Sequence, residues 1–262
     1  MHLLIIVLVS LLASVIGAIA GIGGGVIIRP VLDSLGIMEV AAISFLSGCT
    51  VLSMSAYNAA RSIASGDKSL KKEIAFPLGI GAAAGGVLGK YLFSYVSSLF
   101  ENASRVGAVQ SACLFVVTLI TFVYTLKPSI LPSLRIKNPL LSIAAGLLLG
   151  LISAFLGIGG GPINLMVLSV LYSMNTKDAA QNSLVVIFLS QLASLLSTLI
   201  TRSVPNFSVL MLILMCICGI LGGVIGRIFN KKLSSKQVRF IFLAAMLVII
   251  FLSVKNLIYY LM

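Results

Sequence analysis

The strongest constraint on this chain is a five-residue motif, Gly-Ile-Gly-Gly-Gly, that occurs twice inside long apolar stretches. The first copy is Gly21–Gly25 and the second is Gly157–Gly161. Consecutive glycines destabilise a helix interior by about 1 kcal/mol each. The stretches around them, 3–35 and 139–172, are longer than the roughly 20 residues that span a bilayer. Each motif therefore predicts a helix that is interrupted inside a membrane.

The composition also indicates a membrane protein. Sixty per cent of the residues are hydrophobic and 9% are charged, whereas soluble domains have about 25% charged residues. We expect an all-α polytopic protein of the cytoplasmic membrane, surrounded by lipid bilayer. The loops leave no room for a soluble domain between the eight apolar runs, which are 3–35, 40–60, 74–97, 106–126, 139–172, 179–200, 207–229 and 237–262.

The two halves resemble each other beyond the glycine motif. Residues 85–90, Gly-Gly-Val-Leu-Gly-Lys, recur as Gly-Gly-Val-Ile-Gly-Arg at 222–227, at an offset of 137 residues against 136 for the glycine motifs. Ser44 and Ser183 also coincide if the second half carries a three-residue insertion. Self-similarity at a fixed offset indicates duplication. We expect two repeats, residues 1–130 and 131–262, that together form one transmembrane domain.

The number of membrane segments decides whether the repeats are parallel or inverted. One long helix over 3–35 would give four segments per half and parallel copies. A hairpin that turns at the glycines gives five per half, up to ten in all, and inverted copies. In the hairpin arrangement, thirteen of the eighteen Lys and Arg residues lie in loops of one face, as cytoplasmic loops should. This favours inverted repeats, each a glycine-broken hairpin plus three transmembrane helices, with both termini outside.

The charged and reactive residues exclude several function classes. The net charge of +12 comes from clusters between the apolar runs, which indicates membrane topology rather than nucleic-acid binding. The only histidine is His2, so a catalytic dyad or zinc site lacks its partners. The four cysteines lie in apolar runs. We expect no enzyme activity, no metal and no cofactor.

The glycine motifs are the leading candidate for a binding site. Interrupted helices at matching points of two halves are typical of transporter sites. The helix that begins after each turn presents free N–H groups and a positive dipole end, which favour an anion. The alternative, close helix packing, fits Gly81, Gly85, Gly89, Gly222 and Gly226. The candidate binding glycines are Gly23, Gly24, Gly25, Gly159, Gly160 and Gly161.

Arg29 is the one charge placed well inside a predicted span away from its ends. A charge in that position is costly and is functional by default, although a side chain on a short arm can also snorkel to the surface. Its counterpart in the second repeat is Leu165, so a role for Arg29 would be asymmetric. We include Arg29 among the candidate substrate contacts.

Uncharged polar residues follow each hairpin, and many of them must make ordinary interhelical hydrogen bonds. Hydroxyls and amides can also bind an oxyanion without the desolvation cost of a full charge. All six acidic residues lie at span ends or in loops, so we expect no membrane-embedded carboxylate for proton or sodium coupling. The polar candidates for substrate contact are Ser44, Asn164, Asn182 and Ser183.

These features together resemble the TauE/SafE family of sulfite and organosulfonate exporters. The resemblance is carried by the doubled glycine motif, Pro30, the segments around Ser44 and Ser183, and the late Gly-Gly-x-x-Gly-basic element of each half. It implies export of a small sulfur-containing anion, namely sulfite, sulfoacetate or a related sulfonate. In that interpretation the anion binds between the two glycine-rich breaks and the repeats give alternating access. The alternative is a non-transporting membrane partner that helps to assemble an enzyme complex, and the oligomeric state is open.

Overall fold

The computed structural model describes residues 2–36, 38–98, 103–127, 134–136, 138–158 and 160–261. Over these residues the chain is helical, and seven helices have the length and composition to cross a membrane. This confirms an all-α polytopic membrane protein. The helices are α1 (His2–Ala20), α2 (Gly25–Leu35), α3 (Val40–Ala64), α4 (Lys72–Ser98), α5 (Ala103–Leu126), α6 (Pro139–Phe155), α7 (Pro162–Tyr172), α8 (Thr176–Ile200), α9 (Val209–Lys232) and α10 (Ser235–Leu261).

Both glycine motifs interrupt a helix, as the sequence predicts. Between α1 and α2, Gly21 and Gly23 have φ values of 70° and 75°, a left-handed conformation that glycine adopts without strain. Between α6 and α7, Gly157 has a φ of 63° and Gly160 a φ of 124°. The second new helix then begins at Pro162, which is favoured in a first turn because its missing N–H would be unpaired there.

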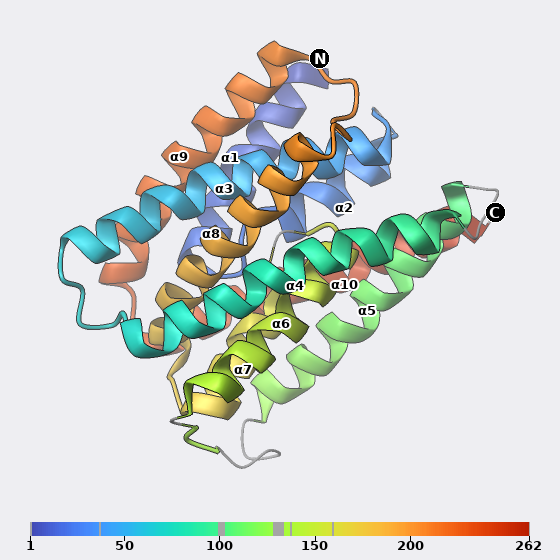
Figure 1. The fold of residues 1–262 in the computed structure, drawn as a ribbon. Helices are drawn as coiled ribbons and strands as arrows, with labels where there is room; N and C mark the ends of the chain where they lie inside the picture. Colours follow the sequence, from blue (N-terminus) through green and yellow to red (C-terminus); the bar gives the residue numbers. More distant parts are fainter. Residues whose placement is uncertain are drawn as a thin grey trace.

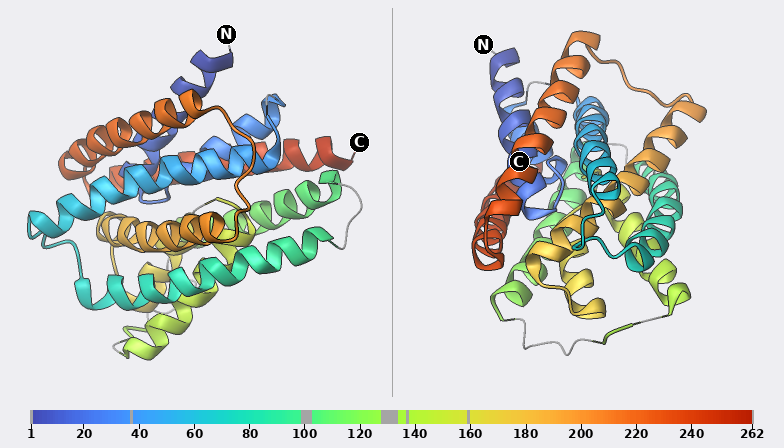
Figure 2. Two further views of the ribbon diagram at one scale, coloured as in Figure 1. Left: turned by 45° about the horizontal axis from the view of Figure 1, so that its top comes forward. Right: turned by 90° about the vertical axis from the view of Figure 1, so that its left-hand side faces the viewer.

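The helices run between two ends of the molecule (Figure 1, Figure 2). We call one end the terminal face, formed by the start of α1, residues 38–39 and 201–208, and the end of α10. The other, the basic face, is formed by residues 65–71, 173–175 and 233–234. The hairpin α1–α2 starts and ends towards the terminal face, and the hairpin α6–α7 towards the basic face. The two breaks therefore enter from opposite ends.

Helices of the two halves are interleaved, and neither half forms a separate body. The broken helix α1 packs against α9, and its counterpart α6 packs against α4, which is the counterpart of α9. In the same way α3 contacts α9 while α8 contacts α4, and the pairs α3–α8 and α5–α10 map onto themselves. Exchanging the halves thus reproduces the main contacts, which supports a repeated architecture.

Glycines bring the backbones of α4 and α6 into contact. A Cβ atom built on Gly81 or Gly85 would lie 2.0 Å from a carbonyl oxygen of α6, and one on Gly146 would lie 2.0 Å from a carbonyl oxygen of α4. The α1–α9 pair is similar, because a Cβ on Gly222 would lie 2.5 Å from Ser14 and one on Gly226 would lie 2.6 Å from Ala18. The packing role expected for these glycines is confirmed.

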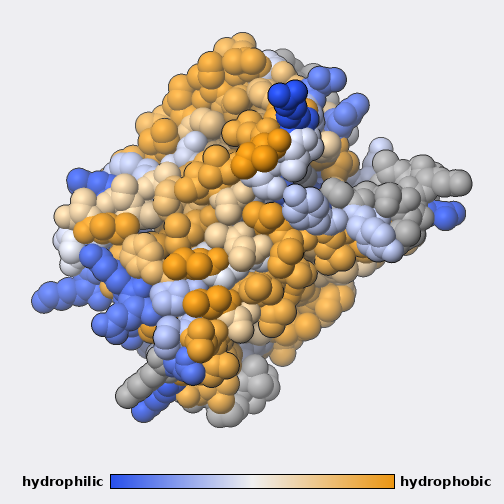
Figure 3. Space-filling model, in the orientation of Figure 1, coloured by the Kyte–Doolittle hydropathy of each residue, from blue (hydrophilic) through white to orange (hydrophobic). Residues whose placement is uncertain are grey.

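The outer surface suits lipid. Large apolar side chains face outward along the helices, including Ile200 at 80% exposure and Phe251 at 70%. Figure 3 shows hydrophobic residues across the middle of one face, with hydrophilic residues gathered mainly at the lower left. That edge corresponds to the basic face in Figure 1. Such an apolar surface is stable only in a bilayer, because water would have to hydrate it.

Gly85→Ala should lower the melting temperature of the purified protein in detergent, since the added methyl would overlap the Leu147 carbonyl. Overpacking of this kind costs roughly 1–3 kcal/mol. Gly48→Ala is the control, because a Cβ there would lie 3.5 Å from its nearest neighbour, an ordinary contact. A Gly85→Ala protein that melts like Gly48→Ala would contradict this account of the α4–α6 interface.

Candidate functional site

The two glycine breaks meet inside the molecule. A Cβ on Gly25 would lie 2.6 Å from the carbonyl oxygen of Ile158, and one on Gly161 would lie 4.0 Å from Val26. Both Ile158 and Val26 are buried. Opposed hairpins thus bring the two turns into contact, and in this conformation they are packed against each other.

The remaining candidate glycines line the same breaks. Gly24 precedes α2, and its carbonyl accepts hydrogen bonds from the N–H groups of Ile27 and Ile28 at 3.0 and 2.9 Å. A Cβ on Gly24 would lie 3.2 Å from the hydroxyl of Ser14 in α1, and one on Gly160 would lie 2.4 Å from Ile187 in α8. Gly23 supplies one of the left-handed turns. Gly159 lies outside the described residues.

Arg29 connects the first hairpin to the second break. Its guanidinium donates to the backbone carbonyl of Leu156, at the end of α6, and to the side-chain oxygen of Gln110 in α5. Gln110 in turn donates to the carbonyl of Phe155 at 2.7 Å. A cation at the C-terminus of a helix stabilises the free carbonyls and the helix dipole there. Arg29 therefore caps α6.

The snorkelling interpretation of Arg29 is wrong, because the residue is only 4% exposed. Burial is possible because its charge is paired: Nε lies 3.7 Å from Oδ2 of Asp33, one turn further along α2. Asp33, one of the acidic residues that we expect at span ends, is also buried, since its side chain is 9% exposed. Asp33 does lie near the end of its helix, but α10 packs against α2 there: Asn256 donates to the carbonyl of Pro30, and Tyr260 lines the same small pocket as Asp33.

The four uncharged candidates lie in different places. Ser44, in the second turn of α3, faces the second break, where a Cβ on Gly157 would lie 3.2 Å from its hydroxyl. Asn164 in α7 and Ser183 in α8 are buried. The side-chain oxygen Oδ1 of Asn164 and the hydroxyl of Ser183 have no hydrogen-bond partner in the described part of the chain. Buried polar atoms without partners are uncommon and call for an explanation.

Asn182 is engaged at the basic face, away from the breaks. Its side-chain oxygen accepts from the N–H of Lys71 at 2.9 Å, and its amide donates to the carbonyls of Ser69 and Asp178, each at 2.8 Å. These bonds tie the α3–α4 connection to the start of α8. Asn182 thus holds a loop in place in this conformation.

A cavity of about 560 Å³ lies between the terminal face and the second break. The part of the cavity nearest the terminal face is lined by the start of α3 and by Ser203 and Pro205. From there the cavity extends inward to Ala154 and Gly157. The lining includes one charged residue among those described, Lys90 of α4. Its polar lining consists of Ser44, Gln110, Gln191, Ser194, Thr198 and Ser203.

Lys90 is not among the candidate residues predicted from the sequence, where it only ends the repeated Gly-Gly-x-x-Gly-basic element, yet it lines this cavity. A signal was present, because Lys90 and Arg227 end the same Gly-Gly-x-x-Gly-basic element in the two halves. A basic side chain repeated inside two apolar runs is costly in a bilayer. Because of that cost, Lys90 and Arg227 call for a role other than the helix packing that explains the glycines before them.

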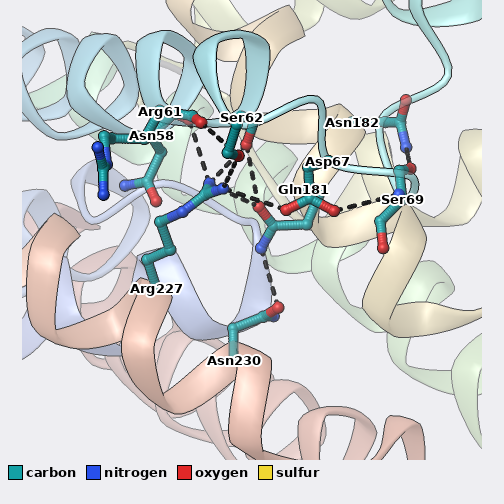
Figure 4. A network of polar contacts seen from close by, with 10 residues as sticks. Asn58, Arg61, Ser62, Asp67, Ser69, Gln181, Asn182, Arg227 and Asn230 are labelled. Atoms are coloured by element: carbon teal, nitrogen blue, oxygen red, sulfur yellow. Dashed lines mark hydrogen bonds and ion pairs between the residues drawn. The ribbon is translucent and has the colours of Figure 1, made fainter.

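Arg227 lies at the other end of the molecule, in a closed polar network (Figure 4). Its guanidinium donates to Asp67 Oδ2 at 3.1 Å, in the α3–α4 connection. It also donates to Ser62 in α3 and to the side-chain oxygen of Gln181 in α8. Gln181 donates to Asn230 at 2.9 Å. One cation therefore joins α3, α8 and α9 at the basic face.

The network also reaches the first break. The Asn230 amide donates to the carbonyl of Ile19, at the end of α1, at 2.7 Å. Phe155 occupies the equivalent position at the end of α6, 136 residues later, and there Gln110 is the donor. Each interrupted helix thus has a terminal carbonyl capped by a side-chain amide from another helix.

Arg29→Met should strongly destabilise the protein, because it leaves Asp33 buried without its cation. Breaking a buried pair costs about 3–5 kcal/mol. The double variant Arg29→Met/Asp33→Asn removes the uncompensated charge and should recover part of that loss in thermal unfolding. The exposed residue Lys72 gives the control, Lys72→Met. Two outcomes would contradict this role: an Arg29→Met protein that melts like the wild type, or a double variant that melts at a lower temperature than Arg29→Met alone.

The family model described as Sulfite exporter TauE/SafE matches residues 6–252. Neither a curated protein nor a solved structure matches the chain. The match covers both glycine breaks, the cavity and the Arg227 network. The chain belongs to the sulfite exporter TauE/SafE family.

Proposed function

We propose that the protein exports a small sulfur-containing anion, sulfite, sulfoacetate or a related sulfonate, across the cytoplasmic membrane. The observation that carries the proposal is the cavity that leads from the terminal face to the second helix break and has Lys90 as its one charged lining residue among those described. Family membership supports transport of such an anion. Both chain ends and the cavity mouth then face the outside.

The central site in this proposal lies between the two breaks and forms when they part. Gly23, Gly24, Gly25 and Gly159, Gly160, Gly161 would offer backbone N–H groups to the anion. Three buried polar atoms support this assignment because they have no partner within the described residues: the hydroxyls of Ser14 and Ser183 and the Asn164 oxygen. Asn182 would contribute only after releasing the α3–α4 connection, and Arg29 positions the second break.

Alternating access would follow from inversion of the repeats. A second cavity, of about 530 Å³, lies at the basic face beside α7 and α10. In this proposal the cavity near Lys90 is the opening towards the terminal face, and the Arg227 network closes the route between α3, α8 and α9 at the basic face. The inward-open conformation requires that this network break and that the cavity close. The exchange symmetry of the helix contacts supports two such alternative arrangements.

The membrane potential can drive export without a coupled ion. An anion that leaves a compartment with a negative interior gains about 2.3 kcal/mol per charge per 100 mV. The one buried carboxylate that we identify, Asp33, is paired with Arg29. This arrangement supports a facilitator whose direction is set by the electrical and chemical gradients.

Purified protein in liposomes loaded with sulfite or propane-1-sulfonate should release the anion, and an imposed inside-negative potential should accelerate release. Protein-free liposomes are the control. Absence of flux for sulfite and for every sulfonate tested would overturn the proposal. It would favour the alternative of a membrane partner that assembles an enzyme complex.

Arg227→Met should open the basic face. The readout is a cysteine at position 183, introduced as Ser183→Cys after replacement of the four native cysteines by alanine. Ser183 is fully buried, so a membrane-impermeant maleimide should label it slowly, and at least tenfold faster from the basic face when Arg227 is removed. Asp67→Asn, a milder change, should act in the same direction.

Lys232→Met is the matched control for this experiment, because Lys232 is exposed at the same end of α9. It should leave the labelling rate unchanged. Equal rates with and without Arg227 in well-folded protein would show that the network does not close this face.

A further inference from the structure

Lys90 is a cation that has no acidic partner in the cavity among the described residues. It lies in α4 near the terminal face, is partly buried, and donates one hydrogen bond, to the backbone carbonyl of Ser194. An ammonium carries three donors. The cavity lining contains no Asp or Glu among the described residues. A positive charge in such surroundings is poorly compensated.

The repeat counterpart of Lys90 makes the contrast clear. Arg227 occupies the same position in the second half, and there the charge meets Asp67 together with the side chains of Ser62, Ser65 and Gln181. The protein itself neutralises the cation at the basic face. At the terminal face an anionic ligand would have to do so.

The walls around Lys90 are mainly apolar. They include Val40, Phe45, Phe93, Val106 and Leu195. Two of the rings are held in place: Phe45 packs on Phe207 with ring centroids 5.1 Å apart, and Phe93 on Phe155 at 6.3 Å. The lining thus combines one cation and six residues with hydroxyl or amide groups with an apolar compartment. This is the usual pattern of a site for an organic ligand.

The size of the cavity also favours an organic ligand. Bare sulfite has four heavy atoms and fills about the space of two or three water molecules, at roughly 30 Å³ each. The cavity measures about 560 Å³. A bare oxyanion would leave most of the apolar wall in contact with water.

We propose that Lys90 anchors the head group of an organic sulfonate whose apolar part packs between Phe45 and Phe93, so that the cavity selects organic sulfonates over bare sulfite. Ser44 and Gln191 are placed to bind further head-group oxygens, since both line the same cavity. This inference rests on the proposed transport function and names the substrate class that it favours.

Isothermal titration of the purified protein in lipid nanodiscs tests the site, with butane-1-sulfonate, sulfite and butan-1-ol as probes. Butane-1-sulfonate should bind at least tenfold more tightly than sulfite, because it fills the apolar compartment. Butan-1-ol should give no measurable binding, because it lacks the anionic group. Sulfite that binds as tightly as butane-1-sulfonate would overturn the proposal.

Lys90→Met should weaken butane-1-sulfonate binding at least tenfold, while Lys90→Arg should retain it. The matched control is Arg105→Gln. It removes an exposed cation at the start of α5, near the terminal face, and Arg105 does not line the cavity. Unchanged binding by Lys90→Met would overturn the proposal. Thermal unfolding checks that each variant is folded, and Lys90→Arg keeps the test decisive if Lys90→Met is not.

Binding and flux separate this inference from the proposed function. Wild-type protein that transports a sulfur anion in liposomes but binds butane-1-sulfonate independently of Lys90 would refute the site and leave the transport function intact. Lys90-dependent binding without flux of any sulfur anion would support the site and refute transport.

Discussion

The structure depends on satisfying the backbone polar groups that the two helix breaks expose inside the membrane. Lipid offers no hydrogen bonds, so irregular backbone at that depth must find partners in the protein. Asn230 caps a carbonyl at the end of α1, and Arg29 and Gln110 cap those at the end of α6. These side chains come from α9, α2 and α5, so the breaks can exist only when helices of both halves have assembled around them.

The two halves share a plan but not their charges. Arg29 has an apolar counterpart, Leu165, and the two cations that do correspond, Lys90 and Arg227, have different surroundings. Arg227 is paired with Asp67, while Lys90 lines a cavity with no described acidic residue. In a bilayer, an unpaired charge is expensive. This asymmetry is the basis for our proposal that an anion binds beside Lys90, whereas Arg227 is neutralised by the protein itself.

The sequence predicted the helices and their interruptions well, because bilayer thickness fixes the length of an apolar helix and consecutive glycines break it. It also separated packing glycines from turn glycines by their spacing. The burial and the hydrogen bonds of Arg29 could not be predicted from local sequence, because its partners Leu156 and Gln110 lie 127 and 81 residues away in the chain. Asp33 looked like an ordinary span-end acid, and only the packing of α10 over α2 reveals its burial. Lys90 was missed because its cavity is assembled from five helices, α3, α4, α5, α6 and α8.

The glycine contacts between helices have a mechanical consequence. Backbones that touch directly, as in α4–α6 and α1–α9, leave no side-chain layer between the two helices, so we expect each pair to move as one unit. Lys90 lies in the α4–α6 pair, which carries the second break, and Arg227 lies in the α1–α9 pair, which carries the first. If either pair moves during transport, its cation and its helix break would move together.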